Sequence, residues 1–246
     1  MVAAPPPVPL AVAFRDPAHG VLGTSRTIEL TADGGKTWKV VLRTPRPVVS
    51  LLFFDGAVWA HYDDGENLRS TDGGRRWAPA VPMFPADSIC PQGTTQSWIS
   101  YTPAGSTWAL CVTQASAGSE GKSVYRLRAN GWKRVAYTPF APPRPGGYGG
   151  ISLYGYPVGI AMAQNGFGVI WESRGTLYVT RDGGSHWTGL PKVARPEVDF
   201  GQSGAALPHG VAYVLLSTGA GDGSGTRRLI ETTDFGRTWH VVHRWP

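Results

Sequence analysis

The chain has 246 residues and a formal net charge of +6, from 23 Lys and Arg against 17 Asp and Glu. Because 33 Gly, 21 Pro and 10 Trp stand beside only 16% charged residues, the composition is typical of short strands joined by tight turns and leaves little room for surface helices. The basic residues are scattered and no stretch approaches the roughly 20 apolar residues of a membrane span, so neither a nucleic-acid partner nor a membrane span is expected.

The chain begins with the proline-rich stretch MVAAPPPVPL, which has neither the charged region nor the apolar region of a signal peptide. This stretch is similar to the first residues that follow a removed leader. We therefore expect an extracytoplasmic protein, either secreted or attached to the cell envelope.

Two anchors recur along the rest of the chain. The first is a glycine-led strand signal, read as GVLG, GAVW, GSTW, GVIW and GVAY, which begins at Gly20, Gly56, Gly105, Gly168 and Gly210. The second, downstream of each glycine anchor, is the box Ser/Thr-x-Asp-x-Gly-x-x-Trp. Its aspartates and tryptophans are Asp33 and Trp38, Asp72 and Trp77, Asp182 and Trp187, and Asp234 and Trp239. The stretch RANGWKR, around Trp132, is a degenerate fifth copy that lacks the aspartate and the glycine pair.

Each repeating unit reads as four short strands, of which one precedes the glycine anchor, one follows it, one leads into the box and one starts at the tryptophan. Four strands in roughly 40–50 residues predict a propeller blade. The fold class is therefore all-β: a single five-bladed β-propeller with four antiparallel strands per blade and a box turn between the third and fourth strands. The predicted blades span residues 8–44, 47–81, 95–138, 151–191 and 196–244. Both terminal blades are complete by themselves, so packing of blade 1 on blade 5 would have to close the ring.

The box has the residues of a hairpin lock. Its aspartate can accept hydrogen bonds from backbone N–H groups of its own turn, its glycines permit positive φ, and its tryptophan is expected to bury its ring against the next sheet. We therefore assign the eight box residues named above to structure and not to catalysis.

This pattern resembles the Asp-box, or bacterial neuraminidase repeat, family of β-propellers, which includes sialidases and photosystem II assembly factor-like proteins. The resemblance covers essentially the whole chain. It implies that the boxes lie on the face opposite the functional site. That site would then be built from the connections between blades and from the loops joining second to third strands, which we call the loop face.

A sialidase-like site would need three arginines, an aspartate acid/base and a tyrosine nucleophile activated by a glutamate. The nearest match to the family's Phe-Arg-Ile-Pro signature is FRDP at Phe14 to Pro17, where Asp16 replaces the isoleucine. This tetrapeptide ends an innermost strand, so Arg15 is expected on the box side, away from the loop face.

Other glycoside hydrolases need only two carboxylates, about 5 to 10 Å apart. Outside the boxes the candidates are Asp63, Asp64, Glu66, Asp87, Glu120, Glu172, Glu197, Asp199 and Asp222. Three of them, in the stretch DDGEN, could chelate calcium, but the same stretch is an ordinary polar hairpin turn. We expect no metal and no cofactor.

Cys90 and Cys111 are too far apart in sequence for a redox or zinc CxxC pair. They could form a disulfide in an oxidising compartment, or remain as two buried thiols.

The stretch from Thr138 to Pro157, TPFAPPRPGGYGGISLYGYP, is the best candidate for ligand binding. Its prolines favour extended backbone, and its rings and guanidinium could contact a glycan or a protein. The candidate ligand-binding residues are Arg144, Tyr148, Tyr154 and Tyr156. Alternatively, the rings close a gap between blades 3 and 4.

No complete catalytic constellation is apparent in the sequence. The sequence therefore favours a non-enzymatic extracytoplasmic binding or assembly scaffold whose protein or glycan ligand binds on the loop face. The alternative is a glycoside hydrolase of sialidase-like fold that acts on an unknown glycan. Two carboxylates converging on the central funnel, one with a strongly raised pKa, would favour that alternative.

Overall fold

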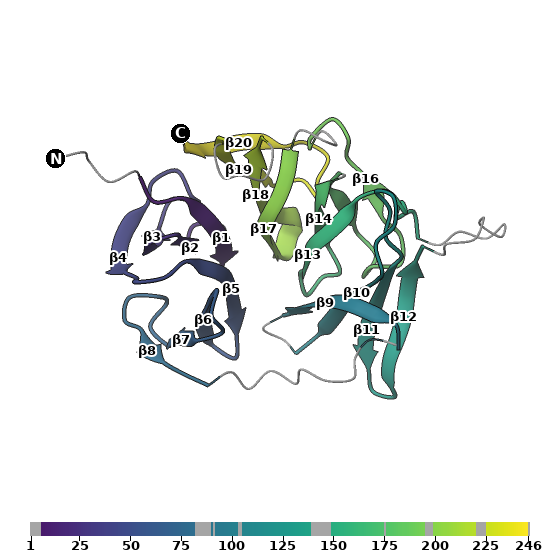
Figure 1. Ribbon diagram of the computed structural model, residues 1–246, viewed down its shortest axis with the longest axis horizontal. Coiled ribbons are helices and arrows are strands. Elements are labelled where there is room, and N and C mark those ends of the chain that lie inside the picture. Colours follow the sequence, from purple (N-terminus) through teal and green to yellow (C-terminus); the bar gives the residue numbers. More distant parts are fainter. Residues whose placement is uncertain are drawn as a thin grey trace.

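The computed structural model describes residues 6–81, 90, 92–102, 105–138, 149–174, 176–194, 199–219 and 225–245. Its strands form five antiparallel sheets of four strands each, and the sheets follow one another around a ring (Figure 1). The first strand of each sheet lies nearest the centre of the ring, and the others follow outward in chain order. The prediction of a five-bladed, all-β propeller is therefore confirmed.

Every blade is built from one continuous stretch of chain. Blade 1 comprises β1 (Pro9–Phe14), β2 (Gly20–Thr24), β3 (Thr27–Thr31) and β4 (Lys39–Arg43). Blade 2 comprises β5 (Val48–Phe54), β6 (Ala57–Tyr62), β7 (Asn67–Ser70) and β8 (Ala78–Pro79). Blade 3 comprises β9 (Thr94–Tyr101), β10 (Thr107–Thr113), β11 (Lys122–Arg128) and β12 (Gly131–Tyr137).

Blade 4 comprises β13 (Tyr156–Met162), β14 (Gly168–Arg174), β15 (Tyr178–Thr180) and β16 (Thr188–Gly189). Blade 5 comprises β17 (Asp199–Leu207), β18 (Val211–Thr218), β19 (Arg227–Thr232) and β20 (His240–Trp245). A short 3-10 turn, Pro208–Gly210, joins the first two strands of blade 5. Across the described part of the chain, no helix is long and apolar enough to cross a membrane.

Apolar side chains fill four of the five junctions between neighbouring blades. Val21 and Val58 belong to the cluster between blades 1 and 2, and Leu110 and Ile170 to the cluster between blades 3 and 4. Corresponding clusters join blade 4 to blade 5 and blade 5 to blade 1. The described residues form no such cluster between blades 2 and 3.

The box turns hold themselves together through their aspartates. In blade 4, the carboxylate of Asp182 accepts hydrogen bonds from the backbone N–H groups of Ser185 (3.0 Å) and His186 (2.9 Å). In blade 1, hydrogen bonds from the hydroxyl and the backbone N–H of Thr37 lower the pKa of Asp33 to about 2. Asp72 and Asp234 accept equivalent backbone hydrogen bonds in their own turns.

Each box tryptophan packs against the preceding blade, which corrects the expectation that it would lie on the next sheet. Trp187 of blade 4 is 4% exposed and belongs to the cluster that blade 4 shares with blade 3. Trp77, Trp239 and Trp38 likewise join the clusters toward blades 1, 4 and 5. The box turn lies against the preceding blade closely enough that a Cβ on Gly184 would come within 3.5 Å of Val124 in blade 3.

Packing of blade 1 on blade 5 closes the ring without a shared strand. The aromatic rings of Phe14 and Tyr213 stack with their centroids 3.7 Å apart, and the Tyr213 hydroxyl donates a hydrogen bond to the carbonyl of Pro17 (2.8 Å). Ser203 of β17 accepts a hydrogen bond from the backbone N–H of Val12 in β1 (3.0 Å). Side-chain packing and hydrogen bonds therefore join the terminal blades.

Candidate functional site

A cavity of about 530 Å³ lies at the centre of the ring, where all five innermost strands contribute side chains or backbone to its wall. The wall consists mostly of small or apolar residues, such as Ala13, Gly159 and Ala205, with hydroxyl groups from Ser50 and Ser97. Its described lining residues include no Asp, Glu, Lys or Arg. The cavity therefore suits an uncharged ligand surface.

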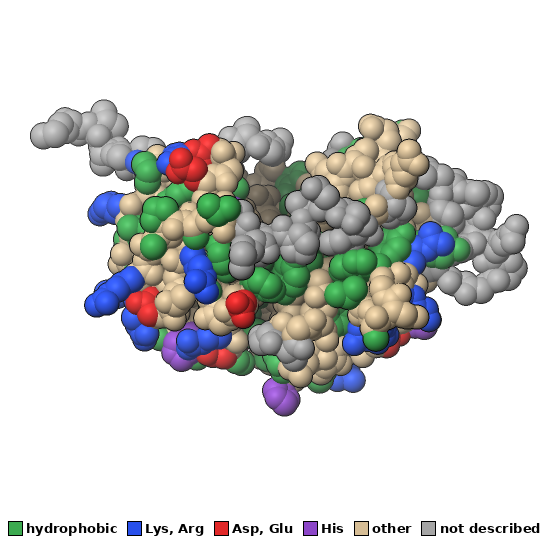
Figure 2. All heavy atoms as spheres, turned by 90° about the horizontal axis from the view of Figure 1, so that it is seen from below, with side chains coloured by type: hydrophobic (Ala, Val, Ile, Leu, Met, Phe, Trp, Pro, Cys, Tyr) green, Lys and Arg blue, Asp and Glu red, His purple; other side chains and the backbone are tan. Residues whose placement is uncertain are grey.

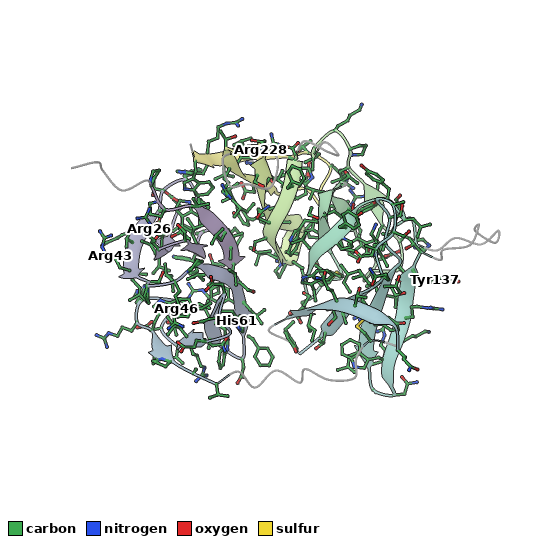
Figure 3. All side chains as sticks on the ribbon, in the orientation of Figure 1. Arg26, Arg43, Arg46, His61, Tyr137 and Arg228 are labelled. Atoms are coloured by element: carbon green, nitrogen blue, oxygen red, sulfur yellow. A yellow bond between two sulfur atoms is a disulfide. The ribbon has the colours of Figure 1, made fainter. Side chains whose placement is uncertain are left out.

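His61 is the only titratable imidazole among the described lining residues of this cavity. It projects from β6 toward the centre of the ring (Figure 3). Burial lowers the pKa of His61, so its ring is neutral at physiological pH and leaves the lining uncharged.

A fully buried ion pair of the loop face lies between blades 3 and 4. Lys122, at the start of β11, places its Nζ 2.9 Å from Oε1 of Glu172 on β14, and both side chains are fully buried. The Lys122 Nζ also donates hydrogen bonds to the carbonyls of Ser152 (2.7 Å) and Tyr154 (2.7 Å). One buried lysine thus fastens the segment before β13 to both blades.

The acid of this pair has an unusual pKa. Burial raises the pKa of Glu172 to about 7, and the nearby Lys122 ammonium opposes that rise only in part. Burial also raises the pKa of the neighbouring Glu120, and Lys122 again opposes the rise. Glu172 is therefore a raised-pKa acid of the kind that a glycosidase would need, but its side chain is paired and enclosed.

A second buried carboxylate of the loop face is also paired. Asp199, at the start of β17, has a fully buried side chain whose Oδ1 lies 2.9 Å from the Arg228 guanidinium. Arg46, in the connection between blades 1 and 2, forms ion pairs with Asp64 and with Glu66 (2.6 Å) of blade 2. The DDGEN stretch is therefore a hairpin turn whose acids face an arginine, which is the ordinary alternative considered for it.

The structure describes only part of the predicted ligand-binding stretch. Arg144 and Tyr148 lie outside the described residues. Tyr156 accepts a hydrogen bond on its hydroxyl from the backbone N–H of Gly118 in blade 3 (3.0 Å), so its ring bridges blades 3 and 4. Tyr154 pairs through its backbone with Ser119, yet 39% of its surface is exposed.

The segment from Gly149 to Tyr156 packs between blades 3 and 4. Ile151 is 6% exposed and belongs to the cluster of those two blades. Gly150 has a φ of +78°, and a Cβ there would come within 2.2 Å of the carbonyl of Trp187, so only glycine fits. In this segment the gap-closing alternative describes most contacts, and the Tyr154 ring is the part that reaches solvent.

Arg15 lies on the box side, since its Nη1 is the nearest neighbour of a Cβ placed on the box residue Gly73, at 3.4 Å. Cys90 and Cys111 form a disulfide. Sequence reasoning did not single out Lys122, because its neighbours Gly121 and Ser123 give no apolar pattern that would indicate burial.

Comparisons with known proteins support the fold and do not assign a function. No protein-family model matches the chain, and no curated protein matches it. Among solved structures, a thermostable family-43 glycoside hydrolase is 11% identical with a TM-score of 0.51, covering 96% of this chain and 92% of its own. A structure of YCF48 bound to D1 peptide is 20% identical with a TM-score of 0.36, covering 96% of this chain and 81% of that one.

YCF48 from Cyanidioschyzon merolae is 17% identical with a TM-score of 0.33, covering 96% of this chain and 84% of its own. The likeness to the family-43 glycoside hydrolase, at 11% identity, shows a shared fold alone. Function must therefore be argued from the site itself.

Proposed function

We propose that this protein is a non-enzymatic binding or assembly scaffold of the Asp-box propeller type. Its ligand is a protein or glycan that binds on the loop face, over the mouth of the central cavity. The observation that carries the proposal is the uncharged lining of that cavity. A hydrolase that cleaves glycosides needs two carboxylates facing the bond, and the described wall offers none.

The buried carboxylates near the loop face support the same conclusion. Glu172 is paired with Lys122, and Asp199 with Arg228, each at 2.9 Å. A carboxylate that is buried and ion-paired with a lysine or an arginine contributes to packing between strands and is not positioned to act on a substrate. The exposed ring of Tyr154 and the uncharged cavity mouth remain as contact surface for a ligand.

We also propose an extracytoplasmic location. The Cys90–Cys111 disulfide supports it, because disulfides persist in oxidising compartments and are rare in the cytosol. Fractionation of the producing cells, with detection of the disulfide by thiol labelling, tests this location.

The function is tested by binding and turnover measured on the same samples. Wild-type protein is screened on a glycan array and a peptide array, and is incubated with a panel of aryl glycosides. We expect binding without turnover, weakened at least about tenfold by Tyr154→Ala, as for an aromatic contact residue. Leu127→Ala is the matched control, since Leu127 is also exposed (42%) but lies on the outer part of blade 3.

Folding must be checked in the same experiment. Tyr154→Ala should lower the free energy of unfolding by less than about 1 kcal/mol, as expected for an exposed side chain. Equal ligand binding by the wild type and Tyr154→Ala would refute this assignment of the contact surface.

The alternative is a glycoside hydrolase, which the raised pKa of Glu172 favours. Turnover of any aryl glycoside that Glu172→Gln abolishes, while the variant keeps its fold, would establish the hydrolase and overturn the scaffold.

A further inference from the structure

A second cavity, of about 320 Å³, lies on the box side of the ring between blades 1 and 2. The box turn of blade 1 contributes Thr37 and Trp38 to its wall, and the box turn of blade 2 contributes Gly73 and Arg75. Arg15, from the turn between β1 and β2, completes this side of the wall. Three turns that are far apart in the chain therefore surround one cavity, whose volume suits a small ligand.

Cationic side chains from all three segments line this cavity, which we call the cationic pocket. Lys39, at the start of β4, joins Arg15 and Arg75 in the wall. The Arg15 Nη1 lies 3.4 Å from the place that a Cβ on Gly73 would take, so its guanidinium reaches the box turn that carries Arg75. The described lining residues include no Asp or Glu. Figure 2 shows several Lys and Arg side chains at the surface of the part of the ring that blades 1 and 2 form.

Nearby carboxylates neutralise only part of this charge. Asp16 accepts a hydrogen bond from the Nε of Arg15 (3.2 Å) and also pairs with His19. The carboxylate of Asp72 accepts backbone N–H groups of its own box turn, and Arg75 donates from Nη1 to the Asp72 carbonyl (3.2 Å). A guanidinium carries more N–H donors than these bonds use. Both arginines therefore keep donors for an anion in the pocket.

Apolar side chains form the floor of the cationic pocket. Val21 and Leu30 belong to the cluster between blades 1 and 2, and Phe53 and Trp38 add aromatic rings. Lys39 pairs directly with Leu30 across β3 and β4, so its side chain stands on the same face of the sheet, toward blade 2. A bare hydrated ion would leave the floor uncovered, and an apolar molecule would leave the cations unpaired. The pocket therefore complements a molecule that has both parts.

The corresponding place between blades 4 and 5 is built differently. Arg181 stands at the box position of Ala32, and its Nε donates a hydrogen bond to the carbonyl of Phe235 in the next box turn (2.9 Å). Thr188 stands there at the position of Lys39. Because Ala32 has no side chain long enough to cross the junction, the space between the box turns of blades 1 and 2 stays open.

We propose that the cationic pocket binds an organic anion, with a carboxylate or phosphate head held by Arg15, Arg75 and Lys39 and an apolar body that covers Trp38. Arginine binds such heads through paired N–H donors, and lysine adds a compact charge. The anion comes either from a small organic acid or from the carboxyl terminus of a partner protein whose last side chain is apolar. This site is separate from the loop face, so its failure would leave the proposed function standing.

Two probes added to the whole chain test the proposal. Phenylpropionate carries a carboxylate near a ring, and phenyl phosphate carries a phosphate. Titration calorimetry measures their affinity, and the NMR signal of the Trp38 indole N–H, assigned with Trp38→Phe, reports the place of binding. We expect at least one probe to bind and to shift this signal. Phenylpropionamide, which lacks the charge, and acetate, which lacks the ring, should bind at least about tenfold more weakly than phenylpropionate.

A matched pair of variants ties the binding to the pocket. Arg75→Ala should weaken binding of the charged probe at least about tenfold, because it removes one of the two guanidinium groups. Arg237→Ala is the control, since Arg237 is also exposed and stands at the same box position in blade 5. Lys39→Ala repeats the test outside any box turn, in case Arg75→Ala does not keep the fold by circular dichroism.

Three results would overturn the proposal: neither probe binds, the amide binds as tightly as the carboxylate, or the Arg75→Ala and Arg237→Ala variants bind equally well. The two sources of the anion are distinguished with a short peptide that ends in phenylalanine. If its free carboxyl form binds more tightly than phenylpropionate and its amidated form does not, the ligand is a protein terminus. If the peptide binds more weakly than phenylpropionate, the ligand is a small organic acid.

Discussion

The junction between blades 3 and 4 and the junction between blades 2 and 3 use similar strands but are packed differently. The first holds the box turn of Asp182, the buried ring of Trp187 and the buried Lys122–Glu172 ion pair. The second has a tight hairpin where the box turn would be. In a repeat protein the stability of the whole is close to a sum over neighbouring interfaces, so one altered repeat changes one junction. The comparison shows that the presence or absence of a box turn changes how one blade packs on the blade before it.

The largest effect should come from removing the box tryptophan at the junction between blades 3 and 4. Trp187→Ala should lower the free energy of unfolding by roughly 3–5 kcal/mol, since it deletes a buried aromatic ring and leaves a cavity. Trp132→Ala, in the degenerate copy, should cost less than about 1 kcal/mol because that ring is only half-buried. Chemical denaturation of both variants measures the difference. Equal losses of unfolding free energy in the two variants would contradict the difference between the box of blade 4 and the degenerate copy in blade 3.

The next effect concerns the buried ion pair and depends on pH. Burial raises the pKa of Glu172 to about 7 from its ordinary value of 4.5, so the folded protein binds more protons than the unfolded chain between these pH values. The free energy of unfolding should therefore fall as pH rises through this window. Relative to Glu172→Gln, the wild type should lose about 2–3 kcal/mol between pH 5 and pH 8.

Denaturation curves of the two proteins at several pH values measure this loss. A difference that stays constant, or that grows in favour of the wild type as pH rises, would contradict the raised pKa of Glu172.

The smallest effect concerns the hydrogen bonds within a box turn. Asp182→Asn should cost about 1 kcal/mol, because the neutral amide accepts the backbone hydrogen bonds of Ser185 and His186 less strongly than a carboxylate does. His186→Ala should cost less than about 0.5 kcal/mol, since it removes only an exposed partner of the same carboxylate. Thermal unfolding compares the two. A larger loss in His186→Ala would show that the ion pair, and not the backbone hydrogen bonds, holds the turn.

The fold could be predicted from the sequence because its information is local. Each box fixes a turn through contacts within eight residues, and each glycine anchor opens a strand, so counting them gives the blades. The direction in which Trp187 packs could not be predicted, since it depends on how one blade lies on another. The altered junction between blades 2 and 3 could be predicted in part, because the RANGWKR stretch shows that blade 3 lacks a full box.

The candidate site was harder to predict because it forms between distant segments. Glu172 was one of many possible carboxylates, and only the fold brings Lys122 from another blade to 2.9 Å from it. Tyr154 and Tyr156 are two residues apart, yet the ring of Tyr154 reaches solvent, whereas the hydroxyl of Tyr156 accepts a hydrogen bond from the backbone N–H of Gly118. The composition of that stretch is compatible with both ligand binding and gap closure, and only the fold shows which of its side chains pack between the blades.

Because blade 1 packs on blade 5 without sharing a strand, any of the five blades could come first in the chain. No strand is exchanged between the two ends, and contacts such as Phe14 on Tyr213 close the ring through side chains alone. A circularly permuted gene that joins the present ends by a short linker, and begins just before Cys90, should therefore encode the same propeller. Its new ends would lie between blades 2 and 3 and would leave every box turn, and the disulfide, within an unbroken stretch of chain.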